Sequence, residues 1–171
     1  MKKNPETSIS AATSRAAEHS KPAETVTPGF LVWRLSMKWR MEVDRVLAPM
    51  GLTHAQYSLL SSLLDMERSG QQPSQSQLAD HTGLEPLYVS KLARRLEDFG
   101  LVQRDPYPGD SRAVQLSLTE SGREATGLAI DFVLPILDEL LAPLGGLGAE
   151  GTEMFARDLA ALLEVPVRPL N

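Results

Sequence analysis

Apolar residues recur at every third or fourth position over most of the chain, and this spacing predicts a mainly helical protein. One such stretch runs from 30 to 47, three shorter ones follow between 52 and 100, and two more lie beyond 119. Two short runs, 101–105 and 113–118, break this period; in the second, apolar and polar residues alternate as in a strand. We therefore predict a mainly α fold with one small β-hairpin.

Residues that favour helix ends support these boundaries. Thr53 with Gln56, and Ser74 with Gln77, have the Ser/Thr-x-x-Gln spacing of a capping box, in which each side chain bonds the other residue's backbone amide. Gly83 is placed to end the helix that starts at Ser74. The next helix begins at Pro86, after a short turn, and is expected to end before residue 100.

The helix that begins at Pro86 has two chemically different faces. Its apolar face is expected to pack in the core and comprises Val89, Leu92, Ala93, Leu96 and Phe99. Its outer face comprises Leu87, Ser90, Lys91, Arg94, Arg95 and Asp98. Lysine and arginine donate to guanine and to phosphates, and serine pairs with either kind of base edge. Tyr88 adds a candidate contact to a phosphate or a thymine methyl group. This arrangement predicts a recognition helix for the DNA major groove.

The hairpin carries a second candidate DNA contact at its tip. The connection 106–112 contains two prolines and a glycine, and Asp110 is close enough to Arg112 for its carboxylate to orient the guanidinium. An arginine held in this way suits a narrow, electronegative minor groove. We also count Arg104, on the first strand, among the candidate DNA contacts. The hairpin is thus predicted to be a DNA-binding wing.

Each feature taken alone has a simpler explanation. Lys91, Arg94 and Arg95 are also what a solvated helix face carries. Asp110 with Arg112 is also an exposed ion pair of a surface turn, which typically contributes about 0 to 1 kcal/mol. The basic helix followed directly by the hairpin favours DNA binding over both.

Five segments together resemble the MarR family of bacterial winged-helix regulators: 52–60 (LTHAQYSLL), 77–84 (QLADHTGL), 88–104 (YVSKLARRLEDFGLVQR), 110–112 (DSR) and 118–122 (LTESG). The similarity runs from about Phe30 to the C-terminus, and its most specific part is the Asp-x-Arg wing followed by Leu-Thr-x-x-Gly. The resemblance implies a homodimer that binds pseudo-palindromic double-stranded DNA, usually as a repressor, and is released by a small molecule or an oxidant. Because the chain has no cysteine, sensing through a thiol is excluded.

The pattern also predicts how the chain is divided. Residues 1–27 are rich in Ser, Thr, Ala, Glu and Lys and are expected to be a disordered extension. Residues 28–171 are expected to form the MarR-like domain, with a winged helix-turn-helix lobe at about 52–118. The apolar helices at about 29–48 and 119–165 need a partner and are the expected dimerisation lobe.

Composition restricts the function classes further. The 171 residues suit one domain, and the absence of cysteine, of a long apolar stretch and of a signal peptide predicts a cytoplasmic protein without membrane contact. The net charge is -5, with 8 basic against 5 acidic residues in 1–50, 6 against 8 in 51–118, and 3 against 9 in 119–171. A negative net charge argues against a nonspecific nucleic-acid coat, which depends on a broad basic surface, and a dimer can keep the acidic C-terminal part away from phosphates.

A candidate effector pocket involves two helices. Trp33, Met37 and Arg40 share one helical face, and His54 and Tyr57 follow on the next helix. These side chains are suited to an aromatic acid whose carboxylate binds Arg40. Packing in the core is the alternative for Trp33 and Met37, and a position beside a helix cap is the alternative for His54.

The sequence contains no recognisable motif for catalysis or metal binding. No Gly-rich phosphate loop, nucleophile elbow or His/Cys cluster with metal-ligand spacing is present, so we predict a non-enzyme without cofactor or metal. The leading interpretation is a dimeric, ligand-responsive transcriptional repressor. The alternative is a winged-helix protein-interaction or dimerisation module with little DNA binding, which the acidic balance and the terminal apolar helices favour.

Overall fold

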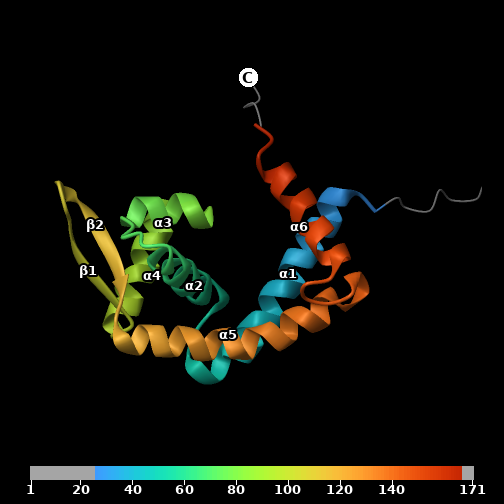
Figure 1. The fold of residues 1–171 in the computed structure, drawn as a ribbon, viewed down its shortest axis with the longest axis horizontal. Helices are drawn as coiled ribbons and strands as arrows, with labels where there is room; N and C mark the ends of the chain where they lie inside the picture. The colour runs from blue at the N-terminus through green and yellow to red at the C-terminus, as the bar shows by residue number, and fades with distance from the viewer. Residues whose placement is uncertain (1–25, 167–171) are drawn as a thin grey trace, which may run out of the picture.

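The computed structural model describes residues 26–166 and has the predicted fold class, mainly helical with one hairpin. Figure 1 shows a lobe that contains the hairpin, and a helical part that extends away from it. The elements are α1 (Pro28–Leu47), η1 (Ala48–Met50), α2 (His54–Arg68), α3 (Gln75–Thr82), α4 (Pro86–Asp98), β1 (Val102–Tyr107), β2 (Asp110–Leu118), α5 (Glu120–Leu141), η2 (Ala142–Leu144) and α6 (Glu150–Leu163). Within the described residues, no helix has the length and apolar character needed to cross a membrane.

The core of the lobe lies between α2, α3, α4 and β2. The largest side chains that are fully buried there are Leu59, Leu60, Leu63, Leu78, Val89, Leu96 and Leu116. Phe99 is not among them, contrary to the predicted apolar face of α4. It follows the last residue of the helix, is 45% exposed, and has the Arg95 guanidinium over its ring at 4.6 Å. The apolar period therefore ends one turn earlier than predicted.

The predicted helix caps are confirmed. Thr53 and Ser74 both form reciprocal capping boxes, with Gln56 and Gln77 respectively. Gly83 ends α3 with φ at +67°, a conformation that glycine adopts without steric cost. The structure shows a further cap at Thr119, which begins α5 by accepting a hydrogen bond from the Gly122 amide. These local signals fix the residues at which the helices begin and end.

The hairpin is longer than the sequence indicated. β1 and β2 pair antiparallel from Val102↔Leu118 to Pro106↔Val114, with an irregularity before Tyr107, so the predicted loop 106–112 shortens to a turn at 108–109. The second side of β2 forms a bridge from Gln115 to Ser74, whereas the second side of β1 has no strand beside it in the described part of the chain. Pro106 is tolerated because it lies on this edge strand. Strand pairing therefore carries the wing out to Asp110.

The helical part consists of α1, most of α5, and α6. α1 and α2 both pack against α5, and Val43, Leu47, Ala129 and Val133 extend the core across this junction. Most of α1 nevertheless presents exposed apolar side chains, as do parts of α5 and α6. They include Phe30, Leu31, Trp33, Met37, Met41, Leu128, Phe132, Met154, Leu162 and Leu163. The predicted disordered extension 1–27 lies outside the described residues, apart from Val26 and Thr27, the latter being the N-cap of α1.

Candidate nucleic-acid interface

The outer face of α4 is the centre of the candidate interface. Leu87, Lys91 and Arg94 are exposed and Ser90 is half-buried, while the opposite side of the helix is packed in the core. No acidic residue in the described part of the chain forms an ion pair with Lys91 or Arg94. The Glu85 carboxylate accepts a hydrogen bond from the Tyr88 amide at 2.9 Å and so caps the helix. The structure thus brings together two cations and a hydroxyl on one open face.

Arg95 and Asp98 lie near the C-terminal end of α4, and both are exposed. The Arg95 guanidinium lies 4.6 Å from the centre of the Phe99 ring, a cation–π contact. This contact holds the guanidinium beside the helix end. Of the predicted DNA contacts on α4, Arg95 is the one whose charged group already has a partner in the protein.

The tip of the wing carries Asp110 and Arg112 as predicted. Arg112 Nε lies 3.5 Å from Asp110 Oδ1, and the Arg112 backbone amide donates to the same oxygen at 3.0 Å. The Arg112 side chain is 92% exposed. The carboxylate therefore restricts the backbone and side chain of an arginine that is otherwise open to solvent.

Arg104 is placed differently from the other candidate contacts. Its side chain is 20% exposed, and Nη1 lies 3.1 Å from Glu97 Oε2, so the pair ties β1 of the wing to α4. Its Nε is buried without a hydrogen-bond partner among the described residues. In this position Arg104 sets the wing against α4, and its predicted contact with DNA stays a prediction.

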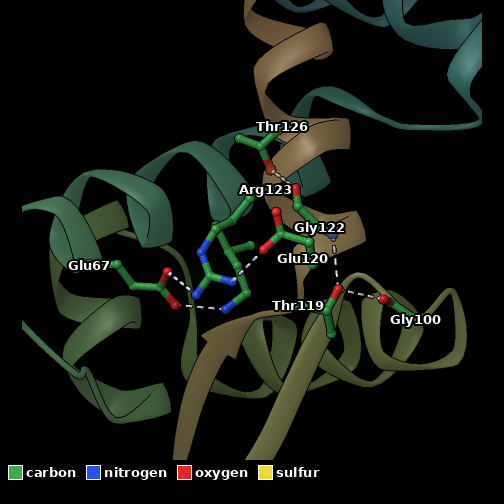
Figure 2. A network of polar contacts seen from close by, with 8 residues as sticks. Glu67, Gly100, Thr119, Glu120, Gly122, Arg123 and Thr126 are labelled. Atoms are coloured by element: carbon green, nitrogen blue, oxygen red, sulfur yellow. Dashed lines mark hydrogen bonds and ion pairs between the residues drawn. The ribbon is translucent and has the colours of Figure 1, made fainter.

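A polar network joins the base of the wing to α5 (Figure 2). Glu67 Oε1 accepts a hydrogen bond from the Leu118 amide at 2.7 Å, and Oε2 accepts one from Arg123 Nη2 at 3.0 Å. On the other side of the wing base, the Thr119 hydroxyl donates to the Gly100 carbonyl at 2.7 Å. Glu67 therefore links α2, β2 and α5, a role that the sequence analysis missed because its partners are 51 and 56 positions away.

The candidate effector residues are only partly assembled. Arg40 Nε lies 3.6 Å from Asp44 Oδ2, and Asp44 Oδ1 accepts a hydrogen bond from the His54 amide at 2.6 Å. Asp44, which the sequence analysis did not single out, thus connects two of the predicted residues. Trp33 and Met37 lie on the exposed side of α1. Three hollows in the described part of the chain, one of about 640 Å³ beside Glu67 and Arg123, are lined by other side chains.

Burial shifts the pKa of two side chains of this candidate pocket, His54 and Tyr57. It lowers the pKa of half-buried His54 below its ordinary value, with Asp44 acting in the opposite direction and Arg40 in the same one. Burial also raises the pKa of Tyr57, and the Asp65 carboxylate adds to this effect. His54 is therefore neutral, and Tyr57 protonated, at neutral pH.

Known proteins share both the sequence and the fold. The sequence model of the MarR family matches residues 52–114. The HTH-type transcriptional regulator YdcH of Bacillus subtilis is 37% identical over 123 residues, which cover 71% of this chain and 81% of YdcH. The chain belongs to the MarR family. An HTH-type transcriptional repressor of Mycobacterium tuberculosis is 32% identical over 103 residues, 59% of this chain and 70% of the repressor.

Solved structures with the same fold include complexes with DNA. The transcriptional regulator MOSR of M. tuberculosis, in complex with DNA, superposes with a TM-score of 0.65 at 25% identity, covering 80% of this chain and 92% of MOSR. The repressor CouR, bound to a DNA duplex, superposes with a TM-score of 0.69 at 25% identity, covering 81% of this chain and 93% of CouR. This MarR-family chain is accordingly a DNA-binding transcriptional regulator and not an enzyme, as the sequence predicted.

Proposed function

We propose that this MarR-family protein is a dimeric, sequence-specific repressor that a small molecule releases from its operator. The observation that carries the proposal is the open face of α4, where Lys91 and Arg94 form no ion pair with any residue that the structure describes, beside a wing whose Arg112 side chain is 92% exposed. A pair of cations in the major groove and an arginine at the minor groove match the two grooves of one DNA duplex. The names of the M. tuberculosis relative and of CouR, both repressors, support repression.

Dimerisation is proposed from the exposed apolar side chains of α1, α5 and α6. Such a surface, spread over three helices, is larger than single exposed residues account for, and it needs a partner to exclude water. A second copy of the chain fits because a symmetric operator requires two recognition helices, roughly 34 to 36 Å apart. We therefore assign DNA binding to about 52–118 and dimerisation to about 29–48 and 119–165.

The effector proposal rests on the chain of contacts from Arg40 through Asp44 to His54. An aromatic carboxylate that binds Arg40 competes with Asp44, which also holds the first amide of α2. Trp33, Met37 and Tyr57 are the apolar and aromatic groups proposed to contact the ring. Binding there changes the junction between α1 and the lobe, and a coupling of about 1 to 3 kcal/mol lowers DNA affinity by about 5- to 150-fold.

Selection of bound duplexes from a random DNA pool, followed by sequencing, tests the DNA-binding part. We expect an inverted repeat with half-sites about one helical turn apart. Affinity for that repeat should fall steeply with salt, with a slope of about -0.9 per phosphate contacted. No enrichment from folded protein, or a flat salt response, contradicts the proposal and favours a protein-interaction module.

The effector part is tested separately on the recovered operator. Salicylate and benzoate are titrated against the complex formed by the wild-type protein and by Arg40→Gln, with acetate as the non-aromatic control. We expect the aromatic acids to release wild-type protein and not the variant. Equal affinity at all concentrations of these acids excludes this effector class and leaves DNA recognition unaffected.

A further inference from the structure

The winged lobe has little exposed apolar surface, and what it has is concentrated in one place. Between residues 52 and 118, the exposed large apolar side chains are Leu87, Tyr88 and Phe99. The Phe99 ring is covered on one face by the Arg95 guanidinium. Leu87, at 71% exposure, and Tyr88, at 43%, lie together in the first turn of α4. The uncovered apolar surface of the lobe is thus at the end of the helix proposed to enter the major groove.

Neither the core nor the proposed dimer interface uses Leu87. The core is supplied by the opposite side of α4, through Val89, Leu92, Ala93 and Leu96. The apolar surface proposed for dimerisation lies on α1, α5 and α6, in the other part of the molecule (Figure 1). Leu87 instead shares a face with Ser90, Lys91 and Arg94, at spacings of three, four and seven residues. Lys91 and Arg94 carry positive charge, which complements DNA phosphates.

We propose that Leu87 is a specificity-determining residue that packs against the C5-methyl group of a thymine in each operator half-site. Leucine has no donor or acceptor, so it cannot read the hydrogen-bonding pattern of a base edge. The thymine methyl is the one apolar group that the four natural bases present in the major groove. A cytosine at the same place carries only a hydrogen at C5, so the contact with a methyl group would be lost. The inference rests on the proposed function and adds the chemistry by which that site selects bases.

Uracil substitution in the selected operator tests this contact, because uracil differs from thymine only by lacking the methyl group. Each thymine of the half-site is replaced in turn, and binding is measured for wild-type protein and for Leu87→Ala. We expect one thymine per half-site at which uracil weakens wild-type binding about fourfold, or about fifteenfold when both half-sites are changed, from the loss of one buried methyl group each. For Leu87→Ala, the same uracil should make no difference.

Two controls separate this contact from other effects. Leu87→Met keeps an apolar side chain and should keep the sensitivity to uracil. Thermal unfolding should be the same in Leu87→Ala and wild type, because the side chain is 71% exposed and outside the core.

The outcomes distinguish this inference from the proposed function. If the operator is bound specifically but no thymine distinguishes wild type from Leu87→Ala, the methyl contact is wrong and the repressor proposal stands. If uracil weakens both proteins equally, another residue reads that thymine, and the assignment to Leu87 is wrong. If no repeat is enriched at all, both proposals are overturned.

Discussion

Replacing Glu67 should loosen the wing from the rest of the protein, and Figure 2 shows why. The Glu67 side chain is 16% exposed and accepts hydrogen bonds from the Leu118 amide and from Arg123. Glu67→Ala removes both acceptors and leaves the part-buried Leu118 amide without a partner. Glu67→Gln keeps an oxygen for that amide and removes only the ion pair with Arg123.

The two variants should therefore differ in stability by an amount that the contacts determine. A hydrogen bond to a charged group contributes about 1.5 to 3 kcal/mol. The ion pair contributes at most about 1 kcal/mol, because the Arg123 side chain is 44% exposed and solvent screens it. We expect Glu67→Ala to lower the free energy of unfolding by about 2 to 4 kcal/mol, and Glu67→Gln by about 1 kcal/mol or less.

Urea unfolding followed by circular dichroism measures this difference. All samples need one protein concentration, because dimerisation makes stability depend on concentration. Glu120→Ala is the matched control: its carboxylate is 4.0 Å from Arg123 and 84% exposed, so the change should stay within about 0.5 kcal/mol. Equal midpoints for Glu67→Ala and Glu67→Gln would refute the reasoning, because the Leu118 amide would then not depend on the carboxylate.

Three further predictions concern other parts of the molecule. Gly122→Ala places a methyl group against the Leu101 carbonyl and should lower the free energy of unfolding by about 1 to 3 kcal/mol or more. Gly127→Ala, on the same helix with open space around it, should not lower it, and thermal unfolding of both variants measures the difference. Arg112→Ala should weaken operator binding by roughly 1 to 3 kcal/mol in an anisotropy titration without changing the urea midpoint, since the side chain is 92% exposed; unchanged affinity would remove the wing from the interface. The lowered pKa of His54 means that the unfolded chain binds its proton more readily, so stability should fall as pH drops below 6.5. The urea midpoint should fall less between pH 7.5 and pH 5.5 for His54→Asn than for wild type. Identical falls would show that His54 does not cause this loss of stability.

Local sequence signals were sufficient for the helices and their ends. The capping boxes at Thr53 and Ser74, the glycine at 83 and the apolar side of α4 each depend on residues within one or two turns, so they are visible as spacings. Phe99 was misplaced for a related reason: periodicity continues in the sequence past the residue at which the helix ends.

Contacts between distant segments could not be predicted in this way. The Glu67 network joins residues more than 50 positions apart, and no local pattern distinguishes Glu67 from other surface acids. Glu97 and Arg104 are seven positions apart on different elements, so their pairing depends on the angle between α4 and the wing. The length of the hairpin was underestimated because two prolines indicate a loop, whereas the edge position of β1 accommodates Pro106. The candidate DNA contacts were found from chemistry and spacing, and they stay predictions.

The length of α5 means that a small change in its tilt produces a large displacement at its end. Its 22 residues span about 33 Å, from the base of the wing at Thr119 to the turn that leads into α6. The first turn is locked to the wing by Thr119 and by the close packing of Gly122 on Leu101. Over such a length a tilt of about 5° displaces one end relative to the other by about 3 Å. A displacement of that size is comparable to the length of a hydrogen bond, so under the proposed function a small tilt of α5 would change where the wing lies relative to a DNA groove.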